Sequence, residues 1–199
     1  MLILKIILFV LWVYALTVLK RGKLGFYYFL VGSVGTFFVL LNFMPYVKDY
    51  FIYGFVWVLG GIGDITGMYE SYAQYGMFFI NHNDTVMSLY VDMECSGIIE
   101  MMVYISLLAF FPAYKPLRKI ITGIVGVLYI CVFNFIRIYT IIWMIFCFGT
   151  PVYSLAHAIV GRIVFYVLTL CLYFYVFTRH QVIGQKVGKF SYENLDDKQ

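Results

Sequence analysis

The sequence predicts an all-α polytopic membrane protein with about six transmembrane helices and a small extracytoplasmic β-hairpin. Of its 199 residues, 63% are apolar, only 12% are charged, and the mean hydropathy is +0.90. A soluble domain has about 25% charged residues, so this chain has too little polar surface to be soluble. We expect one transmembrane catalytic domain over residues 1–178 and a polar cytoplasmic tail over residues 179–199.

Six apolar runs follow one another along the chain, and most are near the length of about 20 residues that crosses a bilayer as a helix. Pro45 is expected to end the second run. The third run has about 13 residues, below the usual spanning length, and could be re-entrant, interfacial or a short tilted span. The fifth run is long enough to be tilted or bent. The runs cover residues 2–19, 24–44, 51–63, 97–113, 120–148 and 163–178.

Two short segments of strand-forming residues, 77–81 and 86–91, lie between the third and fourth runs. They flank His82, Asn83, Asp84 and Thr85, which include good turn formers. The pattern predicts a β-hairpin outside the bilayer. A metal site at this turn is less probable than a plain loop tip, because adjacent turn residues rarely supply a ligand set alone. We expect no metal and no other cofactor.

Basic residues cluster beside the apolar runs, at positions 20–23, 115–119 and 179–189. Such clusters usually mark cytoplasmic loops. With the last two inside, Cys95 lies on the outer side. Six crossings with the amino terminus inside then place Gly22 outside, and whether residues 51–63 cross stays open. No basic face is separate enough from the apolar runs to bind nucleic acid.

Three reactive side chains are expected near the outer membrane face although they are far apart in sequence. Cys95 precedes the fourth run, Arg137 lies about 25 Å along the fifth, and His157 precedes the last. A thiolate is a nucleophile, an imidazole can accept and return its proton, and a guanidinium can stabilise an oxyanion. An arginine within an apolar run is costly, so function is its default interpretation. Together they predict a cysteine acyl-transfer site.

Each of these residues stands in a short motif. Cys95-Ser96-Gly97 stands where a loop becomes a helix, which favours a lowered thiol pKa. Asn134-Phe135-Ile136-Arg137 gives an Asn-x-x-Arg motif within a later apolar helix, and a histidine follows before the final run. The order of these motifs resembles the exosortase and archaeosortase family. The likeness covers roughly half of the chain and fits a short member of the family. Glu94 departs from it, since many members have a small residue there, and its charge would raise the thiol pKa.

The resemblance implies a membrane cysteine transpeptidase or protease that cleaves a C-terminal sorting signal from secreted proteins. Cys95 would be the nucleophile, Arg137 the partner of an oxyanion or carboxylate, and His157 the acid and base, with Ser96, Gly97 and Asn134 in support. The substrate would be a secreted protein with a C-terminal transmembrane helix and a basic end. The enzyme would lie among the lipids of the cell membrane, with its active site at the extracytoplasmic face.

Other interpretations compete with this one. A non-enzymatic transporter component or assembly scaffold could bind an anionic ligand at Arg137, although the paired repeats of many transporters are absent. Arg162 could replace Arg137 as the cation of the site, and Glu100 could orient His157 or face water. Asn134 could bridge helices or brace Arg137. The other cysteines, Cys131, Cys147 and Cys171, are expected to be packing residues.

Overall fold

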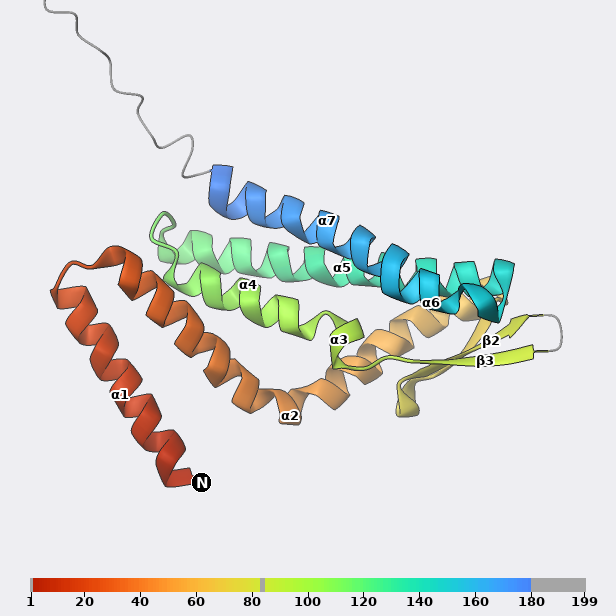
Figure 1. The fold of residues 1–199 in the computed structure, drawn as a ribbon, viewed down its shortest axis with the longest axis horizontal. Coiled ribbons are helices and arrows are strands. Elements are labelled where there is room, and N and C mark those ends of the chain that lie inside the picture. The colour runs from red at the N-terminus through yellow and green to blue at the C-terminus, as the bar shows by residue number, and fades with distance from the viewer. Residues whose placement is uncertain (1, 83–84, 180–199) are drawn as a thin grey trace, which may run out of the picture.

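The computed structural model describes residues 2–82 and 85–179. Four of its helical segments are long and apolar enough to cross a membrane, and a three-stranded sheet lies at one end of the molecule (Figure 1). They are α1 (Leu2–Arg21), α2 (Gly25–Thr66), α5 (Pro116–Phe148) and the segment Thr150–Thr178. Helix α4 (Ile98–Phe110) is apolar but shorter than a usual span. The six apolar runs therefore do not correspond to six separate helices of spanning length, and the expected count of six spans is not confirmed.

Helix α2 joins the second and third apolar runs into one helix of 42 residues, so the expectation that Pro45 ends the second run is wrong. Proline removes one backbone donor and bends a helix, but the helix can continue when its surroundings satisfy the freed groups. Figure 1 shows α2 bending about midway along its length. It ends at Gly67, whose left-handed φ of 66° lets its amide donate back to the Gly63 carbonyl.

Helix α1 pairs only with the first half of α2, as an antiparallel hairpin. The Trp12 indole nitrogen donates to the Val31 carbonyl at 2.9 Å, and Lys5 donates to the Asn42 amide oxygen at 2.6 Å. No other long helix covers α1 (Figure 1). Its apolar side chains are exposed along its length. Such a surface suits lipid, which accepts apolar side chains on every side of a helix.

The C-terminal part of the chain is helical from Thr150 to Thr178, so the last apolar segment begins well before residue 163, where the sequence placed it. Gly149 ends α5, as expected. A short helix α6 (Tyr153–Leu155), a π-helical turn (Ala156–Val160), helix α7 (Gly161–Tyr173) and a second π-helical turn (Phe174–Thr178) then follow without a break. His157 therefore lies inside this helical segment rather than before it.

The expected hairpin is confirmed as strands β2 (Met77–His82) and β3 (Thr85–Tyr90), which pair antiparallel with Met77 opposite Tyr90. A further strand, β1 (Tyr69–Tyr72), pairs antiparallel with β2 and gives the order β1-β2-β3. The turn residues Asn83 and Asp84 lie outside the described part of the chain, as does the expected tail from residue 180 onward.

The basic clusters at 20–23 and 115–119 lie at one end of the molecule, together with the end of the last helical segment. The rings of Tyr28 and Phe110 lie 5.4 Å apart, which places the start of α2 beside the end of α4. The Tyr114 hydroxyl donates to the Val176 carbonyl at 2.7 Å, which adds the end of the last helical segment. The expectation that Gly22 lies opposite the 115–119 loop is therefore wrong. The sheet and the short helix α3 (Met93–Ser96) lie away from this end (Figure 1).

Two apolar clusters hold these parts together. One packs the second half of α2 against the sheet and the end of α5, and includes Phe55, Leu59, Phe78 and Ile142. The other packs α4, α5 and the last helical segment around Tyr104, Phe111 and Phe165. Cys95 belongs to the first cluster, whereas Phe165, which meets Arg137, belongs to the second. The candidate site lies where the two clusters meet.

Candidate active site

Cys95 lies in α3, a single helical turn that follows the sheet. The Asp92 carboxylate caps this turn by accepting a hydrogen bond from the Cys95 amide at 2.9 Å. Ser96 is fully buried, and its hydroxyl donates to the Met93 carbonyl at 2.9 Å. Gly97 then separates α3 from α4. The thiol is therefore not in the first turn of α4, and that helix gives less support to a thiolate than the sequence led us to expect.

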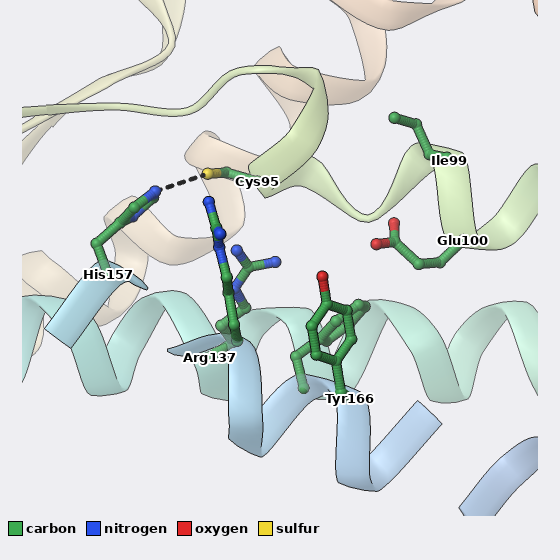
Figure 2. Close-up of a pocket in the computed structure, with 8 residues that line it drawn as sticks. Cys95, Ile99, Glu100, Arg137, His157 and Tyr166 are labelled. Carbon is green, nitrogen blue, oxygen red and sulfur yellow. Dashed lines mark hydrogen bonds between the residues drawn. The ribbon is translucent and has the colours of Figure 1, made fainter. Parts of the chain in front are cut away.

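His157 reaches the Cys95 thiol from the other side of the site. Its Nε2 atom lies 3.7 Å from the Cys95 sulfur, although 62 residues separate the two (Figure 2). The π-helical turn Ala156–Val160 carries this histidine, and such turns occur often at functional sites. Its ring stacks on Tyr153, with centroids 5.6 Å apart and planes 19° from parallel. The nucleophile and base pair expected from the sequence is thus in contact.

Asn134 ties α5 to the backbone that carries the thiol. Its side chain is fully buried, and its amide nitrogen donates to the Cys95 carbonyl at 2.9 Å. Of the two roles considered for Asn134, the structure shows the interhelical hydrogen bond. The contact fixes the position of α3 relative to Arg137, which follows Asn134 by about one helical turn.

Arg137 is buried beside the thiol, with only 5% of its surface exposed. Its guanidinium carbon lies 5.2 Å from the centre of the Phe165 ring, a cation–π contact. Its Nε atom has no hydrogen-bond partner among the described residues, and no carboxylate of the described chain forms an ion pair with it. A buried guanidinium without a carboxylate partner favours an anionic group of a ligand or of a transition state as its partner.

These side chains line a pocket of about 330 Å³. Figure 2 shows Cys95 and His157 at one side and Glu100 and Tyr166 farther along it. Arg162 also lines the pocket, so both arginines considered from the sequence belong to the site. Glu100 is half-buried there, and its Oε2 atom has no hydrogen-bond partner among the described residues. The pocket therefore combines a thiol, an imidazole, two guanidinium groups and one carboxylate.

Sequence reasoning missed Phe165 and Tyr166, which line the pocket, and Tyr153, whose ring stacks on His157. Tyr153 lies four residues before His157, and Phe165 and Tyr166 lie about one turn after Arg162, so helical periodicity could have found them. The Glu94 side chain, expected to raise the thiol pKa, lies outside the described side chains. No cluster of three metal-ligating side chains occurs in residues 2–82 and 85–179.

We predict that replacing Gly97 by alanine will destabilise the protein and disturb the site. Gly97 has a φ of 77°, and an added Cβ would lie 3.3 Å from Asn134. The left-handed conformation alone costs an L-residue about 1–2 kcal/mol. Thermal unfolding of the purified protein in detergent should show a lower Tm. Gly54→Ala is the matched control, since its added Cβ meets nothing within 4 Å; an equal Tm loss in both variants would contradict the prediction.

Comparison of the chain with protein-family models, with curated proteins and with solved structures finds no match.

Proposed function

We propose that this chain is a membrane cysteine transpeptidase or protease of the exosortase type. The observation that carries the proposal is the 3.7 Å contact between the Cys95 sulfur and His157 Nε2 in a pocket also lined by Arg137. The order of motifs in the sequence singled out these three residues. Their proximity in the structure supports the proposal that they act together in catalysis.

The chemistry begins with transfer of the Cys95 proton to His157. The thiolate attacks the carbonyl carbon of the scissile peptide bond, and the oxyanion that forms is stabilised by Arg137. The C–N bond then breaks as His157 returns its proton to the leaving amine, which leaves a thioester on Cys95. Attack by an acceptor amine gives transfer, attack by water gives hydrolysis, and both release the thiol.

The proposed substrate is a secreted protein whose C-terminal transmembrane helix and basic end lie in the same membrane. Such a helix can approach the exposed apolar surfaces of α1 and α2, while its basic end stays at the side of the basic clusters at 20–23 and 115–119. We place the protein in the cell membrane, with the basic clusters inside by the positive-inside tendency. The pocket is then at the extracytoplasmic face. Because α2 is one helix, five crossings by α1, α2, α4, α5 and the last segment fit this arrangement better than six.

The alternative is a non-enzymatic transporter component or scaffold that binds an anionic ligand. The observation in its favour is the pairing of Arg137 and Arg162 in one pocket, with the Nε atom of Arg137 lacking a hydrogen-bond partner among the described residues. The cysteine and histidine contact has no role in this alternative, so the enzyme accounts for more of the site.

The proposal is tested by comparing protein C-termini in cells that carry the intact chain and in cells from which it has been removed. We expect at least one secreted protein to keep its terminal apolar helix and basic end only in the cells that lack the chain. Restoring the chain on a plasmid should restore the shortened terminus. If no terminus differs, the cleavage activity is ruled out and the binding alternative moves ahead.

A further inference from the structure

The second half of α2 has an unusual surface for a helix that leaves a membrane. At about 1.5 Å per residue, 42 residues extend about 63 Å, twice the roughly 30 Å of a hydrocarbon core. The pairing with α1 stops near Asn42, so the first half alone makes one crossing. Since the basic clusters lie together at one end, the second half does not return through the membrane.

The first charged side chains of α2 follow Pro45. Before it, the exposed side chains are uncharged and mostly apolar, as at Phe38 and Phe43, with Asn42 also exposed. After it come the charged neighbours Lys48 and Asp49, whose side chains are 38% and 79% exposed. Charged side chains leave the hydrocarbon core readily, so this pair marks the level at which α2 exits.

At that level and beyond it, four large aromatic residues are exposed on one face of the helix. Tyr46, Tyr50, Tyr53 and Trp57 recur at spacings of three and four residues and are 50% to 81% exposed. Tyrosine and tryptophan combine an apolar ring with a polar group, and they are enriched where membrane proteins meet the lipid headgroups.

We propose that the aromatic face of Tyr46, Tyr50, Tyr53 and Trp57 binds the lipid headgroup layer on the side of the membrane opposite the basic clusters. The opposite face of α2 packs toward the candidate site. There Phe55 is buried and stacks on Phe135 of α5 with centroids 4.3 Å apart, two residues before Arg137. Phe55 and Cys95 belong to the same apolar cluster. The headgroup contact therefore fixes the depth of the pocket at the membrane surface.

One consequence rests on the proposed function. A pocket held at headgroup depth accepts a peptide bond only when that bond lies within a few residues of the outer end of a transmembrane helix. The depth of α2 would thus select the cleavage position in the substrate.

The test uses the full chain in phosphatidylcholine vesicles, with bromine on the acyl chains either near the headgroup or near the chain end. A Trp12→Phe/Trp143→Phe variant leaves Trp57 as the single tryptophan, which is excited at a wavelength that tyrosine does not absorb. We expect shallow bromine to quench Trp57 several-fold more strongly than deep bromine. The matched control keeps Trp12 alone, through Trp57→Phe and Trp143→Phe. Trp12 lies about 14 Å from Arg21 along α1, near mid-bilayer, so deep bromine should quench it more.

Two results would overturn the proposal. Stronger quenching of Trp57 by deep bromine would place the second half of α2 in the hydrocarbon core. Quenching by aqueous iodide, with none by either lipid, would show that the face meets water or another protein. As a second measurement, in a background with the four native cysteines replaced by alanine, Asp49→Cys should react with an impermeant maleimide on intact cells, and Gly22→Cys only after permeabilisation. Neither measurement needs catalysis, so failure here is distinct from failure of the transpeptidase proposal.

Discussion

Cells carrying Cys95→Ala should retain the terminal helix of the substrate as completely as cells that lack the chain. Alanine removes the sulfur that forms the thioester, and no other described thiol lines the pocket. The measurement is the fraction of substrate with a shortened C-terminus, determined by mass spectrometry. Cys95 is almost fully buried and alanine is smaller, so protein abundance in the membrane must be compared at the same time.

Cys171→Ala is the matched control, because this cysteine lies exposed on α7 and away from the pocket. It should process the substrate as the intact chain does. The pair of variants also separates the two candidate functions. A scaffold that binds its ligand through Arg137 would keep its effect on the substrate in Cys95→Ala, and full processing by that variant would end the nucleophile assignment.

The sequence predicted the part of the site that depends on membrane depth. Apolar runs and basic clusters define depth, and Cys95 and His157 were expected at the same level and lie in contact. Arg137 was marked by the cost of a charge in an apolar run, and it is buried in the same pocket. Depth restricts which residues can meet, but it does not show which helices are neighbours. The contact with Phe165 therefore came only from the structure.

The course of the backbone was harder to predict. Pro45 has the local signature of a helix end, yet α2 continues through it because packing and the membrane environment favour helix on both sides. Val152 to Arg162 has a mixed composition, yet it is helical and includes the π-helical turn that positions His157. In both cases tertiary contacts override a weak local preference. The interpretation of Pro45 as a helix end also led to the expectation that Gly22 and the 115–119 loop lie at opposite ends.

Arg137 and Arg162 line the same pocket, and they differ in how the structure holds them. Arg137 is held by a cation–π contact to Phe165 and follows Asn134, which binds the Cys95 carbonyl. It is therefore fixed relative to the backbone of the nucleophile. Arg162 lies one helical turn beyond His157 on the last segment and has no such link to Cys95 in the described contacts. Stabilisation of an oxyanion requires a donor that is fixed before the reaction begins, so Arg137 is the stronger candidate.

Replacing Arg137 by lysine should lower the rate of substrate processing about 10²–10³-fold, the usual loss for one oxyanion donor. Lysine keeps the charge but loses the planar, branched set of donors that guanidinium offers. Arg162→Lys should have a smaller effect, and Arg118→Lys, on the basic end of α5, should have none. The rates follow from pulse-labelled substrate at matched enzyme levels. A larger loss in Arg162→Lys than in Arg137→Lys would transfer the oxyanion role to Arg162 and leave Arg137 as a structural cation beneath the pocket.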